Sequence, residues 1–168
     1  MKTILSRCKT LVRNNNGTGQ TLSYVRDVEV VHPDLSITLI SKASLPKILF
    51  TPVSTVERWV ASGRKEALNV INAYLVLQYM QRESSIMGDE TRPGGQGKGI
   101  IDFVGDFLSV FRGQRFTTGG SPYLDKPMDV TNIDYADPIS IEDGYLLVAA
   151  LTLECSRLFD QAALPGNI

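Results

Sequence analysis

The fold is decided by one stretch near the end of the chain, Gly144-Tyr145-Leu146-Leu147-Val148-Ala149-Ala150-Leu151-Thr152-Leu153-Glu154-Cys155-Ser156-Arg157-Leu158. Read in steps of two residues, one face carries Tyr145, Leu147, Ala149, Leu151, Leu153 and Cys155. The other face begins apolar and becomes polar toward its end, as expected for a strand that packs one side on a core. A helix could also hold so apolar a run, but the strict alternation from Leu151 to Ser156 favours a strand. We expect the rest of the chain to pair with this strand or to cover it.

Length and composition indicate one ordinary globular domain. The chain has 168 residues, of which 43% are hydrophobic and 21% charged, enough for a core without metal or disulfide support. The net charge of −1 gives no reason to expect a nucleic-acid or membrane-surface partner. No stretch reaches the roughly 18 apolar residues of a membrane span. Ser6, Arg7 and Lys9 interrupt the first apolar segment, so it is not a signal peptide and synthesis in a cytosol is expected.

Two segments show the apolar spacing of amphipathic helices. The first runs over 4–12 and should end in the Asn- and Gly-rich run 14–17. The second runs over 100–111 and should end at Arg112-Gly113, with Asp102 and Asp106 facing outward. The apolar stripes are Ile4, Leu5, Cys8, Leu11 and Val12 in the first segment and Ile100, Val104, Phe107, Leu108 and Phe111 in the second.

Several shorter segments predict strands. Half-exposed or short strands are expected over 24–31, 37–40 and 56–60, and prolines bracket another over 45–52. The alternating segment Met128–Tyr135 is predicted as an edge strand. The run Ala67–Gln81 fits both a helix and a strand, and its β-branched and aromatic residues favour a long strand buried on both faces.

The remaining stretches are predicted to be two long loops and a C-terminal tail. We expect a single domain over 1–160 with long loops at 83–98 and 113–126, and a flexible tail over 161–168. The first loop is polar and glycine-rich, which suits a segment that orders on contact with another protein.

Each candidate site has a plainer structural interpretation. Gly94–Gly99 lacks a phosphate-loop spacing, because Arg92 and Gly99 stand where a glycine and a Ser or Thr are needed. Cys8 and Cys155 fit buried apolar positions better than a disulfide or metal site. The single histidine, His32, precedes a proline in a turn and offers little to metal or nucleophile chemistry.

Two larger groups of residues also have a structural and a functional interpretation. The acids Asp125, Asp129, Asp134, Asp137, Glu142 and Asp143 could supply oxygens to a hard cation, but their spacing matches no EF-hand and aspartates are common in turns. Trp59 and Arg58, with Tyr24 or Tyr74, could stack nucleic-acid bases, but interleaved acids oppose that function.

The order of the elements resembles the tail terminator, or tail completion, and neck proteins of long-tailed bacteriophages. The segments that carry the resemblance are Ile4–Val12, Leu45–Pro52, Gly99–Arg112 and Gly144–Arg157. It implies an α+β fold, with a twisted, mainly antiparallel sheet and an N-terminal and a second helix packed on one face. This chain departs from the shortest members of that family by the loop 83–98 and the segment 113–126.

The resemblance also implies a function. Such proteins are virion components that form a homohexameric ring at the head–tail junction, cap the tail tube and join it to the head connector or adaptor. It implies neither an enzyme nor catalytic, metal-binding or cofactor-binding residues, and no membrane partner. A contact with DNA passing through the ring stays open. The alternatives are a head-completion or adaptor ring and a small metal-dependent hydrolase that uses the acids Asp125–Asp143.

Overall fold

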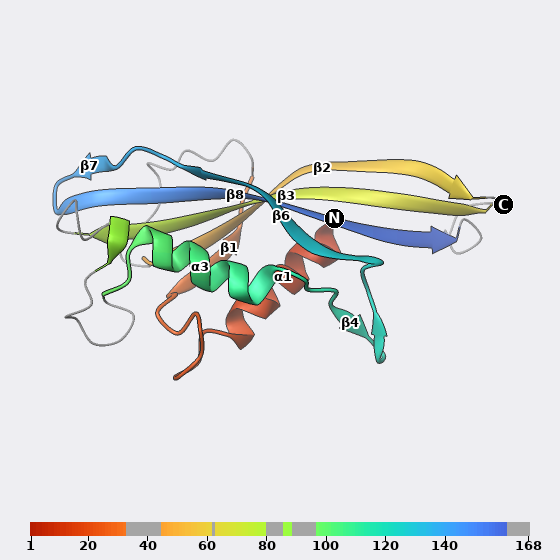
Figure 1. The fold of residues 1–168 in the computed structure, drawn as a ribbon, viewed down its shortest axis with the longest axis horizontal. Coiled ribbons are helices and arrows are strands. Elements are labelled where there is room, and N and C mark those ends of the chain that lie inside the picture. The colour runs from red at the N-terminus through yellow and green to blue at the C-terminus, as the bar shows by residue number, and fades with distance from the viewer. Residues whose placement is uncertain (33–44, 62, 80–85, 89–96, 161–168) are drawn as a thin grey trace.

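The computed structural model describes residues 1–32, 45–61, 63–79, 86–88 and 97–160, and a long twisted sheet dominates it (Figure 1). The predicted strand near the end of the chain is β8, Gly144–Asp160, and it lies between β3, Arg64–Tyr79, and β6, Lys126–Tyr135. Its apolar alternation is explained by packing, because one face of β8 lies in the main apolar core.

The sheet is mainly antiparallel. Its strand order is β1-β2-β3-β8-β6, where β1 spans Asp27–Val30 and β2 spans Lys47–Ala61. Among the strands that the structure describes, only the β1–β2 pair is parallel. A short strand, β7 (Ile139–Ile141), pairs with the beginning of β8. The position of β6 at the end of the order confirms the predicted edge strand.

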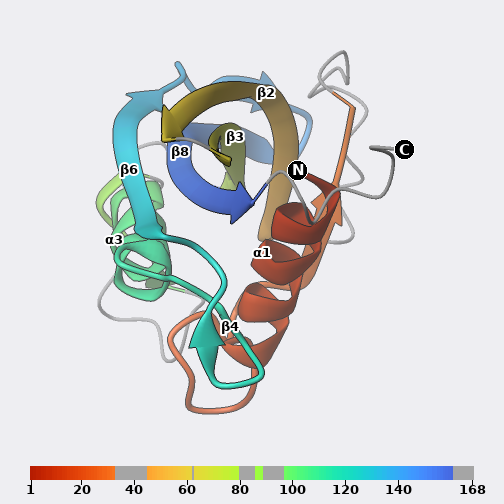
Figure 2. The same ribbon diagram turned by 90° about the vertical axis from the view of Figure 1, so that its right-hand side faces the viewer.

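Both predicted helices form and both pack on one face of the sheet. These are α1, Lys2–Asn14, and α3, Ile100–Phe111, and Figure 2 shows both below the curled strands. Their buried residues join those of β2, β3 and β8 in one apolar cluster. The predicted α+β class, with two helices on one face of a twisted sheet, is thereby confirmed.

Three phenylalanines form the centre of this core. The rings of Phe107 and Phe111 stack with centroids 4.1 Å apart, and Phe50 of β2 lies 6.3 Å and 5.6 Å from them. All three are fully buried. Aromatic pairs in such contact add to the stability that apolar burial already provides, so they fasten α3 to the sheet.

The ambiguous run Ala67–Gln81 is a strand as far as Tyr79, and residues 80 and 81 lie outside the described residues. Its core face is fully buried at Ile71, Ala73 and Leu75. On the opposite face Leu68 is exposed and the next side chains are half-buried, and only Val76 is buried, where it joins Leu49 in a second, smaller apolar cluster. The expectation of burial on both faces is therefore right near the end of β3 and wrong for most of its length.

Strand β2 is longer than predicted. Residues 47–52 of the first predicted segment and all of 56–60 belong to one continuous strand, and Pro52 does not end it. A register shift between Pro52 and Ser54 lets the ladder with β3 continue past the proline. Proline cannot donate to a ladder, and a bulge is one of the places where a sheet accommodates it.

A second bulge corrects the predicted faces of β6. Strict alternation would place Val130 and Ile133 on opposite faces. A register shift between Val130 and Asn132 adds one residue to β6, and both apolar side chains then pack on the core. The extra residue reverses the alternation on one side of the bulge.

Strand β1 is shorter than the predicted 24–31, because Tyr24 lies in a turn before it and contacts α3. Its hydroxyl donates a hydrogen bond of 2.8 Å to Oδ2 of Asp106, which Lys98 also contacts. Asp106 is therefore engaged and does not face outward as predicted. Burial and the bond to Asp106 raise the pKa of Tyr24 well above its ordinary value.

A buried lysine fixes the place of β1. Lys47 is 5% exposed, and its Nζ lies 3.1 Å from Asp27 and 3.2 Å from Glu29. Burial alone would lower the pKa of Lys47, but the two carboxylates outweigh burial and raise it. The pairing of Asp27 with Lys47 in the register thus has an ionic as well as a backbone component.

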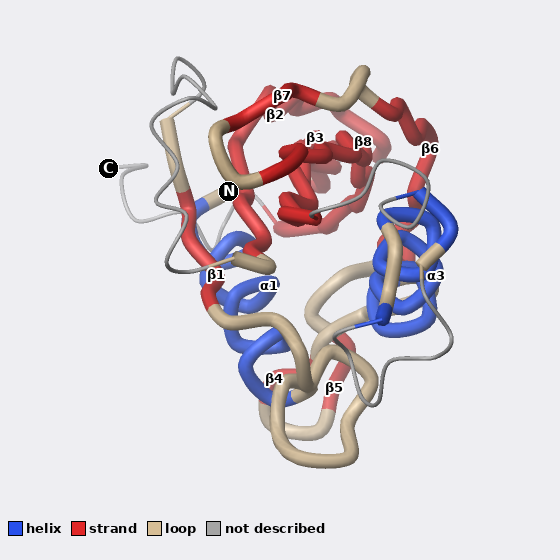
Figure 3. The backbone as a smooth tube through the Cα atoms, turned by 90° about the vertical axis from the view of Figure 1, so that its left-hand side faces the viewer, coloured by secondary structure: helices blue, strands red, loops and turns tan. Residues whose placement is uncertain are grey.

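The predicted loop 113–126 contains structure of its own. Strands β4 (Thr117–Thr118) and β5 (Ser121–Pro122) form a small hairpin (Figure 3), and Leu124 after it is fully buried.

The expected strand at 37–40, most of the loop 83–98 and the tail 161–168 lie outside the described residues. Within the described part of the chain, no helix is long and apolar enough to cross a membrane.

Candidate functional site

Three strands of the sheet continue beyond the helix layer. This extension, called the blade here, consists of residues 53–61 of β2, 64–68 of β3 and 156–160 of β8. Figure 1 shows it projecting past α1 and α3 with no helix beneath its tip. The two-residue connection between β2 and β3 contains Gly63 in a left-handed conformation, φ 74°, which suits a tight hairpin.

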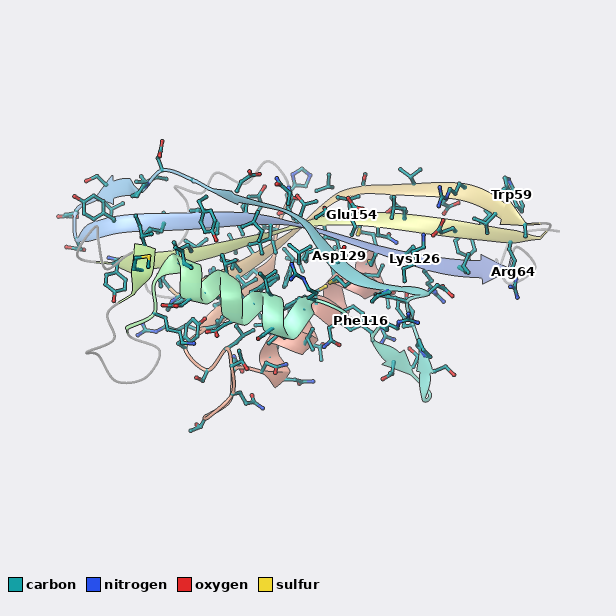
Figure 4. All side chains as sticks on the ribbon, viewed as in Figure 1. Trp59, Arg64, Phe116, Lys126, Asp129 and Glu154 are labelled. Carbon is teal, nitrogen blue, oxygen red and sulfur yellow. The ribbon has the colours of Figure 1, made fainter. Side chains whose placement is uncertain are left out.

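The blade exposes several large apolar side chains. Trp59 is 56% and Val56 is 54% exposed, and Val53, Val60, Leu68 and Leu158 are also exposed. Val56 lies directly opposite Leu68 in the register, so both are on one face. Trp59 lies opposite Lys65, whose Nζ is 4.9 Å from its ring centroid. Figure 4 shows Trp59 and Arg64 near the tip.

A nearly buried carboxylate joins the strands of the blade. Glu66 of β3 is 5% exposed, and its Oε2 accepts bonds of 2.7 Å from both Nε and Nη2 of Arg58 in β2. Its Oε1 lies 3.3 Å from Nζ of Lys126 in β6. The bond from Arg58 holds the pKa of Glu66 below its ordinary value. The carboxylate therefore stays ionised near neutral pH and links three strands.

The base of the blade is tied to the hairpin β4–β5. The guanidinium carbons of Arg7 and Arg157 lie 4.1 Å and 4.3 Å from the ring centroid of Tyr123. Arg7 also donates a 2.8 Å hydrogen bond to the carbonyl of Thr117. These contacts join α1, β8 and the hairpin, so the blade projects from a braced support.

A pocket of about 480 Å³ lies where β6 leaves β8. Leu68 and Met128 supply apolar surface, Arg112 and Lys126 positive charge, and Asp129 and Glu154 negative charge. Figure 4 shows Lys126, Asp129 and Glu154 toward the base of the blade. Charges of both signs line the pocket in equal number, and this balance favours no single class of charged ligand.

The acidic series is distributed along β6, β7 and their flanking turns. Asp125 accepts a hydrogen bond from the backbone of Leu158, and Asp129 accepts one of 2.9 Å from the backbone of Val130. Asp134 accepts one of 2.6 Å from Asn132. Among the described residues, no group of three or more His, Cys, Asp or Glu side chains is placed to hold a metal ion. The geometry thus does not bring the suggested hydrolase acids together.

The other candidates are separated or engaged in packing. Tyr24 packs on Phe103 of α3 with ring centroids 5.3 Å apart, while Arg58 pairs with Glu66, so the suggested stacking platform does not form. Cys8 and Cys155 are free and buried, as predicted from their apolar positions. The described end of the glycine-rich loop begins α3, where the N–H of Gly99 donates to Asp102 at 3.1 Å. That contact caps the helix.

Sequence reasoning missed the blade because it divided β2 into two short pieces. The available signal was the series Val56, Trp59 and Val60, four to eight residues after Pro52. Apolar residues at these positions favour continuation of the strand. Whether they are exposed depends on which elements pack against them, and this follows from the tertiary structure alone.

Comparisons with known proteins add little to this description. No protein-family model matches the chain, and no curated protein matches it. One solved structure, whose name describes no function, is similar with a TM-score of 0.42 and 15% sequence identity, over 92% of this chain and 96% of the other. A likeness this distant supports no conclusion about family or function.

Proposed function

We propose that this chain is a structural protein of a bacteriophage virion, which forms a homohexameric ring at the head–tail junction. There it caps the tail tube and joins it to the head connector. The observation that carries the proposal is the blade, whose apolar side chains Val56, Leu68 and Leu158 are exposed on a projecting part of the sheet. An exposed apolar surface of this kind favours a protein partner.

The construction of the blade supports a contact function. Continuous hydrogen-bonded strands, the Arg58–Glu66–Lys126 ion group and the Tyr123 contacts hold the surface in place before any partner arrives. A preformed surface binds with a smaller loss of conformational entropy than one that must order on contact. The edge strand β6 gives the subunit a second side at which another chain can lie.

The ring is tested by mass photometry and negative-stain electron microscopy of the purified full chain over a range of concentrations. We expect closed rings whose mass corresponds to six copies. A protein that stays monomeric at every concentration would contradict the proposal.

The blade is tested by complementation. Val56→Asp places a charge on the blade, and Val30→Asp, at an exposed position of edge strand β1, makes the same change elsewhere. In an extract of cells infected with the parent phage lacking this protein, we expect Val30→Asp to restore joined particles. Val56→Asp should restore at least about tenfold fewer, as expected when a central interface residue is lost. Equal yields would contradict a partner role for the blade.

A further inference from the structure

Charge is segregated along the chain in a way that its net value conceals. The first 26 residues contain five basic residues and no acid: Lys2, Arg7, Lys9, Arg13 and Arg26. Residues 127–156 contain six acids and no basic residue: Asp129, Asp134, Asp137, Glu142, Asp143 and Glu154. The two segments largely cancel each other in the total of −1, yet three residues of each gather on a separate surface of the folded molecule.

The basic surface is the outer side of α1. Lys2, Lys9 and Arg13 are seven and four residues apart, so they lie on one stripe of the helix. Lys2 and Arg13 are exposed and Lys9 is partly exposed, and none of the three takes part in a salt bridge within the described chain. At 1.5 Å per residue, the stripe is about 16 Å long.

The acidic surface is the open edge of the sheet. Asp129 and Asp134 of β6 are exposed, and Asp137 follows the strand. None of these three joins a salt bridge among the described residues. At about 3.3 Å per residue, Asp129 and Asp134 lie about 16 Å apart, a separation that matches the basic stripe.

The two surfaces lie on opposite sides of the molecule. Figures 2 and 3 view the protein along its strands from either end, and in both α1 and β6 are on opposite sides. A pair of different, complementary surfaces placed in this way produces head-to-tail contacts, which close into a ring when the rotation between copies allows it. A basic stripe alone would suit any polyanion, but the matching acidic edge in the same chain favours a second copy.

We propose that the lateral contact of the ring joins the α1 stripe of one copy to the β6 edge of the next. This inference rests on the proposed ring function and names the surface that builds it. The contact runs across the short dimension of the molecule, while the blade projects along the long one. The blade is then left to a different partner above or below the ring.

A charge exchange tests the contact in the full chain. One variant carries Lys9→Glu and Arg13→Glu, and the other carries Asp129→Lys and Asp134→Lys. Each alone should form at least about tenfold fewer rings, because like charges then face each other. An equal mixture should restore rings, since each reversed surface meets its opposite on the other variant. Glu142→Lys with Asp143→Lys, at the turn between β7 and β8, makes the same charge change as the second variant and should form rings normally.

The outcomes separate this inference from the function on which it rests. If wild-type rings form and both reversed variants form them equally well, the α1–β6 contact is wrong and the ring proposal stands. Absence of rings from the wild-type protein overturns both. Should a variant fail to fold by circular dichroism, salt titration of wild-type rings decides the matter. Raising NaCl from about 0.1 M to about 1 M screens exposed charges and should release subunits, and an unchanged ring mass would overturn the contact.

Discussion

Arg58 and Glu66 face each other across the β2–β3 hairpin, and two nitrogens of the guanidinium lie 2.7 Å from the same carboxylate oxygen. The other oxygen lies 3.3 Å from Nζ of Lys126. Glu66 of β3 therefore connects β2 to the edge strand β6, whose Lys126 lies 60 residues further along the chain. This group ties the hairpin of the blade to the edge of the sheet.

The Glu66 group makes stability depend on pH. Its pKa in the folded protein is lowered from the ordinary 4.5, so its contribution is present above that value and is lost as the pH falls through the folded pKa. We expect the thermal denaturation midpoint to fall between about pH 5 and about pH 3, and to fall less steeply in Glu66→Gln. Differential scanning calorimetry measures both slopes. Glu57→Gln, which removes the more exposed pair with Lys65, should keep the wild-type slope; equal slopes for all three proteins would refute the assignment.

The phenylalanine cluster sets the stability of α3. Phe107→Ala removes a fully buried ring that contacts both Phe50 and Phe111, and should reduce the free energy of unfolding by about 3–5 kcal/mol. Denaturation by urea, followed by circular dichroism, measures the loss. Ile101→Ala on the exposed side of the same helix should change it by less than about 0.5 kcal/mol. Similar losses at the two sites would mean that α3 does not pack as described.

Alanine should have opposite effects on stability at Gly99, the N-cap of α3, and at Gly105, inside the helix. A Cβ on Gly99 would lie 2.3 Å from the backbone nitrogen of Gly88 and 2.5 Å from the carbonyl oxygen of Ile86, so Gly99→Ala should destabilise by about 1–3 kcal/mol. A Cβ on Gly105, in the middle of the helix, meets nothing within 4 Å, and Gly105→Ala should stabilise by about 0.5–1 kcal/mol. Urea denaturation of the two variants gives the signs. Stabilisation by Gly99→Ala would show that residues 86–88 do not approach the helix start.

The cysteines should react only after unfolding. Burial raises the pKa of Cys155 to about 11, and burial and the neighbouring Cys155 raise the pKa of Cys8 further. A pKa two units above the ordinary 9.0 lowers the thiolate fraction about 100-fold at neutral pH. Labelling with a disulfide reagent such as DTNB should therefore be slow in native protein and rapid in guanidinium chloride. Fast reaction of both thiols in the native state would disprove their burial.

The helices and the central strand could be predicted because their patterns are local. The stripe Ile4–Val12 and the alternation over Gly144–Leu158 each require one packed face, and the sequence shows that face directly. The bulge at Thr131 could not be predicted. One unpaired residue in β6 does not change the type of residues in the segment, and its effect is to reverse the alternation of the side chains between the two faces. The effect of Pro52 could not be predicted either, because it ends the strand or not according to whether the register with β3 can shift at that point.

The candidate surfaces were harder to predict than the fold. Net charge averages over the chain, so the opposition between Lys2–Arg13 and Asp129–Asp137 disappears in the total. The exposure of Val56 and Trp59 depends on how far α1 and α3 extend beneath the sheet. Periodicity shows which residues share a face, and the arrangement of elements in space decides whether anything covers that face.

The central position of β8 also governs how the protein can be made. Strands β3 and β6 both pair with β8, and they do not pair with each other. During translation the ribosome releases both of them before residues 144–160 emerge, and each must wait with an unpaired edge. The sheet is therefore completed late in synthesis, and a nascent chain stalled before Gly144 would expose two strands with unpaired edges to cellular chaperones.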